Sequence, residues 1–163
     1  MARTAMFSTR IDLPGEAREK IIQVLNQHLA DTFDLYSQTK QAHWNVKGPQ
    51  FFPLHELFDK LADEVADQAD LLAERATSLG GVALGTARLT AATSRLPDYP
   101  AEATTGRHHL DGLAVRFAAL AATTRGAIDV ASELGDAGTA DLFTEVSRAL
   151  DKALWFLESH IQQ

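Results

Sequence analysis

One uninterrupted helical stretch constrains this chain more than any other feature. Residues 51–79 contain no glycine, and their only proline, Pro53, lies in the first turn, where a missing N–H costs no hydrogen bond. The stretch therefore predicts one long helix. Gly80 and Gly81 follow immediately and are a strong signal for its end. The rest of the chain has to be arranged around this helix.

Apolar residues spaced three and four apart predict three further long helices. The first begins after Asp12, which we interpret as its N-cap, and runs to about Val46. The third covers about residues 102–134, and the last runs from about residue 139 to near the C-terminus. No alternation typical of β-strands and no tandem repeat is evident, so we expect an all-α protein.

The connections between these helices decide how they are arranged. Short turns join the first helix to the second and the third to the fourth, whereas residues 82–100, rich in Thr, Ala and Ser, join the second to the third. One short helix is expected around residues 87–94 of this connection. This is the pattern of a four-helix bundle with one long crossover. We expect a single domain over residues 12–163, preceded by a short mobile N-terminal arm of residues 1–11.

Composition limits the classes of function. The 163 residues contain no cysteine, which excludes disulfides and thiolate metal sites and fits a reducing cytoplasm. No apolar run reaches the roughly 18 residues of a membrane span, and residues 1–10 lack the apolar segment of a signal peptide. We therefore expect a soluble cytoplasmic protein with no membrane partner. The formal net charge of −7 argues against a general nucleic-acid binder, because a negative surface repels phosphate, and is compatible with attracting cations.

Two pairs of potential metal ligands lie on the predicted helix 51–79. His55 and Asp59 are four residues apart and share one helix face, and so do Asp70 and Glu74. The step from Asp59 to Asp70 amounts to almost whole turns, so the two pairs point in similar directions but lie about 16 Å apart along the axis. This distance is too large for both pairs to bind one small ion. A single subunit therefore cannot close the site.

A second copy of the chain would remove this difficulty. Two copies of the helix that cross antiparallel about a two-fold axis near Glu64 and Val65 would bring the carboxylate pair of one copy to the histidine–aspartate pair of the other, and would build the site twice. His43 fits the same scheme, because the turn at residues 47–49 lies almost midway between His43 and His55, and a helical hairpin hinged there places both imidazoles at one level. The predicted ligands of each shared site are His43, His55, Asp59, Asp70 and Glu74.

The chemistry of these ligands limits the choice of metal. Imidazole nitrogen and carboxylate oxygen without sulfur suit borderline to hard divalent ions, with iron, manganese and zinc as candidates. Several carboxylates favour redox-active iron, because anionic ligands stabilise the ferric product. No Glu in the sequence has a His three residues later, so a site built from Glu-x-x-His motifs within one bundle is not expected. The alternative is a helical scaffold without metal, on which these side chains form a solvated helix face.

Four segments of the sequence form a recognisable family pattern. They are residues 41–48 (QAHWNVKG), the pair His55-x-x-x-Asp59, the motif Asp70-x-x-x-Glu74-Arg75, and residues 151–158 (DKALWFLE). Together they resemble the Dps family, the mini-ferritins of starved bacterial cells, and the resemblance extends over about residues 12–160. It implies a ferritin-like four-helix bundle that assembles as a hollow homo-oligomeric dodecamer with active sites at its two-fold interfaces.

The resemblance also implies an activity and residue roles. It implies a ferroxidase that oxidises Fe(II), preferentially with hydrogen peroxide, and stores a ferric mineral, which protects the cell from oxidative damage. Iron is then the metal, and zinc or manganese could substitute for it. Trp44 resembles the family tryptophan that donates an electron to oxidising intermediates; the alternative is aromatic packing at a helix end. Arg75 is expected to pair with a carboxylate near the site. Carried over by position, one subunit supplies His43, His55 and Asp59, and its partner supplies Asp70 and Glu74.

A function of a different kind is a DNA-condensing protective shell in which metal oxidation is secondary. Family members that condense DNA often carry a lysine-rich terminal tail, whereas residues 1–11 contain Arg3 and Arg10 and no lysine. Each neutralised phosphate adds only a modest, salt-sensitive increment of affinity. We therefore expect DNA binding to be weak or absent, although a nucleoid-associated location is compatible with the family.

Two groups of acidic residues are candidates for handling iron outside the ligand set. The first forms a stripe beside the ligand face, which we expect to face the cavity and seed mineral; simple solvation is the alternative. The second surrounds the turn between the third and fourth helices, where similar proteins have acidic three-fold pores. The members are Glu56, Asp63 and Asp67 in the stripe, and Glu133, Asp136 and Asp141 at the turn.

Overall fold

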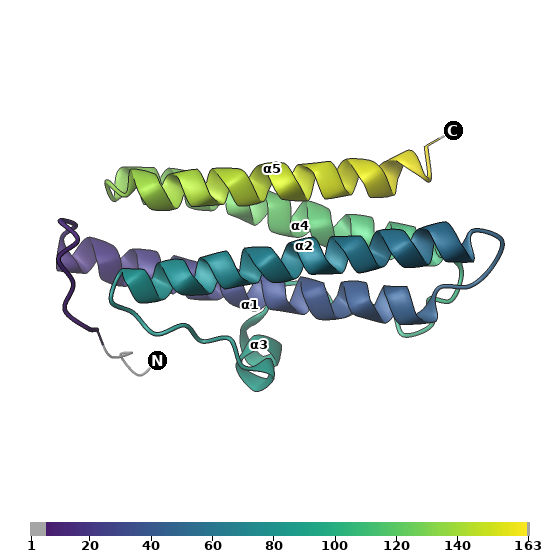
Figure 1. Cartoon of the computed structure of the whole chain (residues 1–163), viewed down its shortest axis with the longest axis horizontal. Helices are drawn as coiled ribbons and strands as arrows, with labels where there is room; N and C mark the ends of the chain where they lie inside the picture. The colour runs from purple at the N-terminus through teal and green to yellow at the C-terminus, as the bar shows by residue number, and fades with distance from the viewer. Residues whose placement is uncertain (1–5, 163) are drawn as a thin grey trace.

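The computed structural model describes residues 6–162, in which five helices and no strand occur. These helices are α1 (Gly15–Asn45), α2 (Phe51–Ser78), α3 (Ala87–Thr93), α4 (Gly106–Glu133) and α5 (Ala137–Ser159). α1 and α2 form one antiparallel pair, α4 and α5 form a second, and the crossover with α3 runs beside α1 (Figure 1). The predicted four-helix bundle with one long crossover is thus confirmed. No helix in the described residues is long and apolar enough to cross a membrane.

Local sequence signals predict the end of α2 correctly but not the start of α1. α2 ends one residue before the predicted position, and Gly80 adopts a φ of 89°, a left-handed conformation that glycine reaches without strain. At the start of α1 the N-cap position is Pro14, whose side chain makes no capping hydrogen bond. The prediction of Asp12 as the N-cap is therefore wrong. Pro14 begins the helix instead with its fixed φ of −54°.

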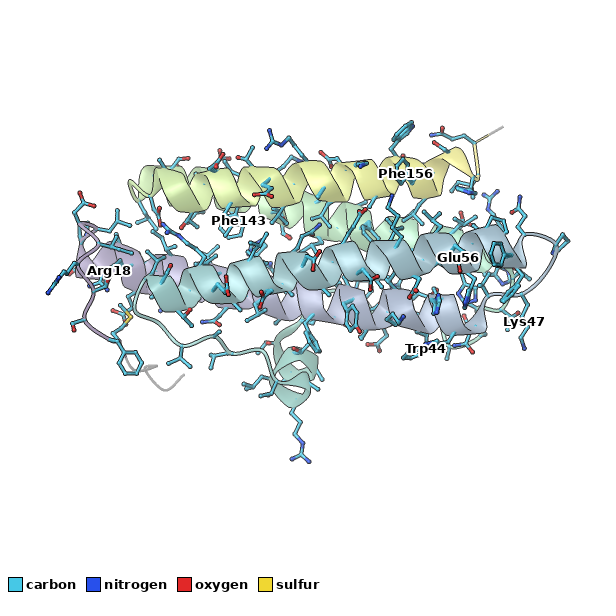
Figure 2. All side chains as sticks on the ribbon, in the orientation of Figure 1. Arg18, Trp44, Lys47, Glu56, Phe143 and Phe156 are labelled. Atoms are coloured by element: carbon cyan, nitrogen blue, oxygen red, sulfur yellow. The ribbon has the colours of Figure 1, made fainter. Side chains whose placement is uncertain are left out.

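The apolar core has two parts that lie toward opposite ends of the bundle. The hinge-end cluster, near the α1–α2 turn, is built around the fully buried Leu54, Phe58 and Phe117. The turn-end cluster, near the α4–α5 turn, contains Leu72 and the fully buried Phe143, which Figure 2 labels at that end. Both clusters join residues from all four long helices. The packed core therefore holds both ends of the α1–α2 pair rigidly.

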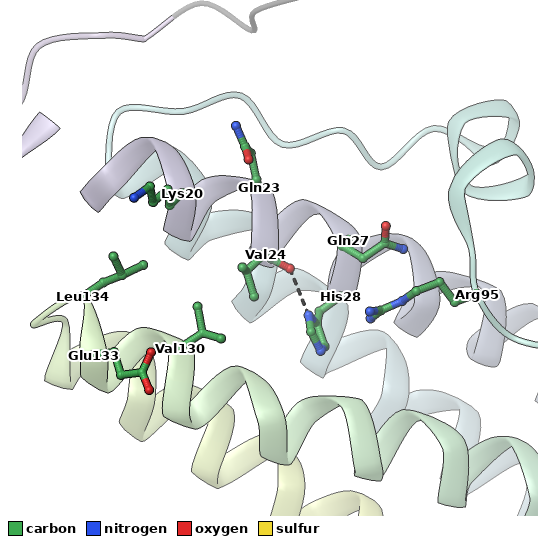
Figure 3. A pocket seen from close by; sticks show the side chains of 9 residues that line it. All are labelled: Lys20, Gln23, Val24, Gln27, His28, Arg95, Val130, Glu133 and Leu134. Carbon is green, nitrogen blue, oxygen red and sulfur yellow. Dashed lines mark hydrogen bonds between the residues drawn. The ribbon is translucent and has the colours of Figure 1, made fainter. Parts of the chain in front are cut away.

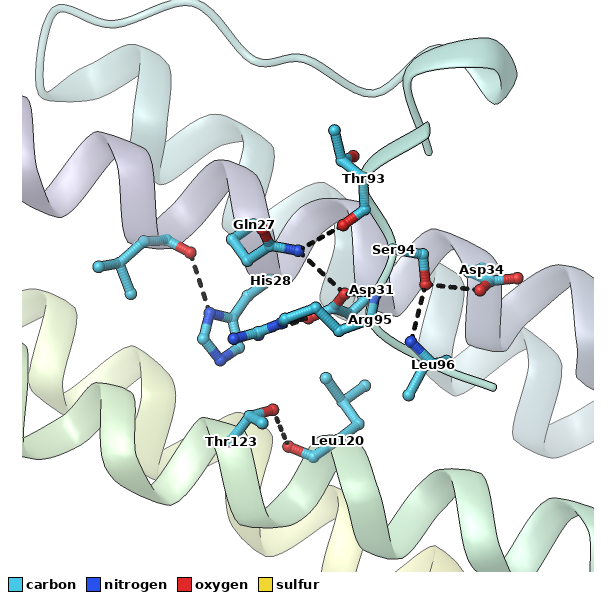
Figure 4. A network of polar contacts seen from close by, with 11 residues as sticks. Gln27, His28, Asp31, Asp34, Thr93, Ser94, Arg95, Leu96, Leu120 and Thr123 are labelled. Carbon is cyan, nitrogen blue, oxygen red and sulfur yellow. Dashed lines mark hydrogen bonds and ion pairs between the residues drawn. The ribbon is translucent and has the colours of Figure 1, made fainter. Parts of the chain in front are cut away.

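The crossover is attached to α1 by polar contacts (Figure 4). Asp31, which is 1% exposed, accepts hydrogen bonds from the Arg95 amide (2.8 Å) and guanidinium (2.5 Å and 2.9 Å). Ser94 donates to the Asp34 carboxylate at 2.6 Å. These bonds satisfy a buried carboxylate, which would otherwise be destabilising, and they fix the path of the crossover.

A buried ion pair fixes the turn between α4 and α5. Asp136 is 3% exposed and accepts hydrogen bonds from the Thr139 amide at 2.9 Å and from the Arg75 guanidinium at 2.7 Å. Arg75 therefore pairs with a carboxylate that caps α5 rather than with a predicted metal ligand. The interpretation of Asp136 as part of an iron entrance is wrong, because its carboxylate is buried and already paired. Glu133 and Asp141 are exposed, and their role stays a prediction.

Part of the expected N-terminal arm lies against the domain. Residues 1–5 of that arm lie outside the described residues. In the remainder, the Phe7 amide donates to the Gly80 carbonyl at 2.7 Å, and Ile11 packs against the turn-end cluster. Residues 6–11 thus contact the end of α2 and the core beneath it.

Candidate metal site

A pair of stacked histidines lies at the hinge of α1 and α2. His43 comes from the last turn of α1 and His55 from the beginning of α2, and their ring centroids are 3.8 Å apart with an interplanar angle of 21°. The Nδ1 atom of each ring lies within hydrogen-bond distance of the other residue's backbone carbonyl, at 2.8 Å for His43 and 2.9 Å for His55. The hairpin places both imidazoles at one level, as the position of the turn predicts.

These two hydrogen bonds determine which ring nitrogens are available. A carbonyl oxygen only accepts, so the Nδ1 of each ring must carry the hydrogen and donate it. In the neutral rings of His43 and His55 the Nε2 atoms then keep their lone pairs, which is the state that a metal ion requires. The reciprocal bonds hold both rings in this orientation within one subunit.

Asp59 lies beside the histidine pair, and its carboxylate is paired with a lysine. The His43 Nε2 and the Asp59 Oδ1 are 3.7 Å apart, and the Lys40 ammonium lies 2.5 Å from the same oxygen. The hydrogen bond from Lys40 lowers the pKa of Asp59, and the same bond raises the pKa of Lys40. Lys40 was not among the residues predicted for the site. Its position three residues before His43, on the same helix face, is the signal that could have found it.

The other two predicted ligands lie farther along α2. Asp70 and Glu74 are exposed, and their carboxylates form no hydrogen bond or ion pair with other residues in the range 6–162. Within that range, no group of three or more His, Asp or Glu side chains gathers in an arrangement suited to a metal ion. One subunit therefore stacks His43 on His55, with Asp59 near His43, and leaves Asp70 and Glu74 apart from them. The shared-site prediction starts from this separation.

Large apolar side chains are exposed beside the histidine pair. Trp44 is 67% exposed and Phe52 is 68% exposed, and the Phe51 ring lies 5.2 Å from the His55 ring. Figure 2 shows Trp44 and Lys47 at the same end of the bundle. Trp44 is not packed into the core of its own subunit, although the Lys40 ammonium lies 5.9 Å from its ring centroid. Exposed aromatic residues grouped in this way are typical of a surface that another protein covers.

A cavity of about 590 Å³ lies at the opposite end of the bundle, between α1 and α4 (Figure 3). Lys20 and Arg95 line it together with Glu133, so both signs of charge face it. His28, also at its wall, is 4% exposed and bonds through Nδ1 to the Val24 carbonyl at 2.9 Å. Burial lowers the pKa of His28, which favours its neutral form. The cavity is separate from the histidine pair and adds no ligand to it.

The fold and these ligands define a ferritin-like helical bundle with a candidate metal site at one end. The ferritin family, described as a ferritin-like domain, matches residues 22–163. The DNA protection during starvation protein of Agrobacterium fabrum (strain C58) is 46% identical over 155 residues, which are 95% of this chain and 96% of that protein. The chain belongs to the Dps family of ferritin-like proteins.

Solved structures agree with this assignment. DpsC from Streptomyces coelicolor matches with a TM-score of 0.91 at 33% identity, over 98% of this chain and 92% of that chain. A Dps protein from Vibrio cholerae O1, described as a member of a broad superfamily of ferritin-like diiron-carboxylate proteins, matches with a TM-score of 0.90 at 28% identity, over 97% of this chain and 99% of that chain. Membership of this family supports iron binding, iron storage, protection from stress and a homo-oligomeric assembly in general.

Proposed function

We propose that this protein is a cytoplasmic ferroxidase and iron-storage mini-ferritin. It oxidises Fe(II), with hydrogen peroxide as the preferred oxidant, at sites shared between two subunits, and stores the ferric product as mineral inside a dodecamer. The observation that carries the proposal is the reciprocal bonding of His43 and His55, which leaves both Nε2 lone pairs free beside Asp59. Iron is here the substrate and the cargo.

The positions of the two groups of ligands support a site shared between subunits. The histidines and Asp59 are at the hinge end, and Asp70 and Glu74 are exposed farther along α2, with Asp70 about 16 Å from Asp59. An antiparallel second copy of α2 brings the carboxylate pair to the histidine end of its partner and forms two equal sites. The partner would also cover the exposed Trp44 and Phe52.

The ligand set suits oxidation of Fe(II). Two Fe(II) ions supply the two electrons that one hydrogen peroxide takes up, and with two protons the products are two Fe(III) and two water molecules. Carboxylates favour this direction, because their negative charge stabilises Fe(III) more than Fe(II). Consuming peroxide and Fe(II) together would suppress hydroxyl radical formation. In the proposal, Trp44, next to His43 in the sequence, can supply an electron to oxidising intermediates. Zinc or manganese would compete for the same ligands.

The acidic stripe on α2 supports the storage part of the proposal. Glu56, Asp63 and Asp67 are all exposed, so their carboxylates are available to solvent on the free subunit. Grouped carboxylate oxygens bind hard cations such as Fe(III) and would seed the mineral. The stripe faces the cavity of the proposed shell.

DNA condensation is the second candidate function, because a relative carries the name DNA protection during starvation protein. In this chain residues 1–11 contain two arginines and no lysine, and the formal net charge is −7. Even twelve such arms acting together would have to overcome the repulsion between an acidic shell and phosphate. We expect no gel shift with DNA at about 0.15 M salt, because this concentration screens the attraction between the two arginines and phosphate. A clear gel shift would favour the DNA-condensing shell over the ferroxidase as the main function.

The proposal is tested by stoichiometric Fe(II) oxidation with hydrogen peroxide. The double variant Asp70→Ala, Glu74→Ala should lose at least about 100-fold in rate, because removing metal ligands or their close supports has effects of this size. The matched control is Glu102→Ala, Glu145→Ala, which removes the same charge from exposed positions off the site and should behave like the parent. All three proteins are compared as assembled oligomers. Equal rates in the ligand variant and the parent would overturn the proposal.

A further inference from the structure

A buried tyrosine–histidine pair lies where the crossover meets α4. The Tyr99 hydroxyl is 2.7 Å from the His109 Nδ1, and the two rings are nearly parallel, with an interplanar angle of 12°. His109 is fully buried and Tyr99 is half-buried. Neither residue belongs to the proposed ligand set.

Both groups are in their neutral forms in this environment. Burial raises the pKa of Tyr99, which keeps the phenol protonated. Burial lowers the pKa of His109, which keeps the imidazole neutral, while the Asn45 backbone favours a proton on the ring. The Nε2 of His109 makes no hydrogen bond of ordinary geometry within residues 6–162. With Nε2 as the protonated nitrogen, Nδ1 accepts the hydrogen bond that the Tyr99 hydroxyl donates.

The pair lies close to the hinge-end histidines. Asn45, whose backbone acts on His109, is two residues after His43 in the last turn of α1. The fully buried ring of Phe58, three residues after His55, lies edge-on to His109 at a centroid distance of 6.3 Å. His109 is thus the inner member of the pair, and its neighbours Asn45 and Phe58 are close in sequence to His43 and His55.

A fixed positive charge beside Tyr99 requires that the phenol loses its proton when Tyr99 is oxidised. The Arg116 guanidinium lies 5.3 Å from the Tyr99 ring centroid and is held by hydrogen bonds to Gln38 (2.7 Å) and to the Gly112 carbonyl (2.8 Å). A neighbouring cation opposes a positive charge on the ring. Tyr99 can therefore lose an electron readily only if its phenolic proton leaves at the same time, and the His109 Nδ1 is in place to take it.

We propose that Tyr99 is a one-electron donor to the iron-oxidising site and that His109 accepts its phenolic proton. The proposal rests on the ferroxidase function proposed above. It applies when a site holds one Fe(II), because hydrogen peroxide takes up two electrons and one Fe(II) supplies only one. Tyr99 then supplies the second electron. With two protons from solvent, the products are Fe(III), two water molecules, a neutral tyrosyl radical and protonated His109.

The composition of the chain makes this step easy to observe. The sequence has two tyrosines and two tryptophans, so few side chains compete as radical sites. Tyr36 is the matched control, since it packs against Phe33 at 5.9 Å and has no hydrogen bond to a histidine within residues 6–162. The assembled protein receives less than one Fe(II) per site and then hydrogen peroxide, and rapidly frozen samples are examined by electron paramagnetic resonance. A Trp44→Phe background removes the signal of the nearby tryptophan.

We expect a tyrosyl radical that is lost in Tyr99→Phe and kept in Tyr36→Phe. His109→Gln, which keeps a polar side chain but no base, should lower the radical yield roughly tenfold or more, since general-base assistance is worth at least this factor. Ring-deuterated tyrosine should narrow the parent signal. A purely structural role of the pair would change the thermal midpoint of unfolding but leave the radical on Tyr99 in His109→Gln.

The possible outcomes separate this inference from the proposed function. Fast Fe(II) oxidation without a tyrosyl radical, or with a radical that persists in Tyr99→Phe, would overturn the donor role and leave the ferroxidase proposal intact. Absence of Fe(II) oxidation by the parent would overturn both. Release of hydroxyl radical, measured with a spin trap at the same iron load, should rise in Tyr99→Phe and not in Tyr36→Phe.

Discussion

The two halves of α2 carry their proposed ligands in different ways. In the first half, His55 is stacked on His43 and bonded to its carbonyl, with Asp59 beside them. In the second half, Asp70 and Glu74 are exposed at the surface. The histidine half is thus organised within the subunit, whereas the carboxylate half is presented outward. The contacts within one subunit therefore orient only the histidine half, and in the proposed site a second copy supplies the carboxylate half.

Neighbouring residues in the second half of α2 sharpen this contrast. Arg75 turns inward to the buried Asp136, whereas Glu74 faces solvent. We predict that Asp136→Ala lowers the free energy of unfolding by about 3 kcal/mol, because it leaves the partly buried Arg75 guanidinium without its partner and removes the cap of α5. Glu74→Ala should change it by only about 0.5 kcal/mol. Urea denaturation of both variants measures this, and equal losses would contradict the inward and outward roles.

Each end of the bundle holds a buried histidine whose pKa is lowered by burial, and this predicts a pH dependence. Burial places the folded-state pKa of both His28 and His109 below the unfolded value of about 6.5. The unfolded chain then binds more protons, so stability is fully present above about pH 6.5 and falls as the pH drops toward the folded-state pKa values. Thermal unfolding from neutral pH to about pH 5 should show this loss.

Variants of His28 and His109 measure how much each end of the bundle contributes to the pH dependence of stability. His28→Gln and His109→Gln should each flatten the slope between about pH 6.5 and pH 5, whatever they do to stability at neutral pH. The exposed His160 provides the control, and His160→Gln should keep the parent slope. An unchanged slope in both buried-site variants would show that other groups carry the effect.

The smallest predicted effect concerns Lys40, whose ammonium occupies the Asp59 oxygen that a metal would use. Lys40→Met should tighten binding of Co(II), used as a spectroscopic probe, by roughly two- to fivefold, because an ion pair that solvent still reaches competes only weakly. Lys60→Met removes an equally charged residue from α2 that pairs with Glu64 at 3.9 Å, away from the histidines, and is the control. Weaker binding in Lys40→Met would mean that Lys40 orients Asp59 rather than competing with the metal.

The sequence was most informative where local chemistry decides the structure. The bounds of α2 follow from the positions of Pro53 and Gly80, and the level of His43 and His55 follows from the turn between them. A cap read from residue type alone failed at Asp12, because Pro14 already begins the helix.

Contacts between distant segments could not be predicted in the same way. The pairing of Arg75 with Asp136 joins residues on different helices, and the bond from Tyr99 to His109 depends on the path of an irregular crossover. Helical periodicity describes which face a residue occupies and not which element lies opposite. The second half of the proposed site depends on another subunit, which a single chain can indicate only by the spacing of its ligands.

The measurement that tests the shared site most directly is complementation between two inactive variants. One variant is His43→Ala, His55→Ala and the other is Asp70→Ala, Glu74→Ala. They are unfolded together in equal amounts and reassembled, and the oligomers are checked by size before Fe(II) oxidation with hydrogen peroxide is measured. In a mixed pair across a two-fold axis, one of the two sites receives intact histidines from one chain and intact carboxylates from the other.

Random pairing makes half of the two-fold pairs mixed, so about a quarter of the parental sites should be restored. We predict that the reassembled mixture recovers about a quarter of the parent's oxidation, whereas each variant reassembled alone recovers none. Mixed oligomers of the correct size that oxidise no Fe(II) would contradict a site shared between subunits.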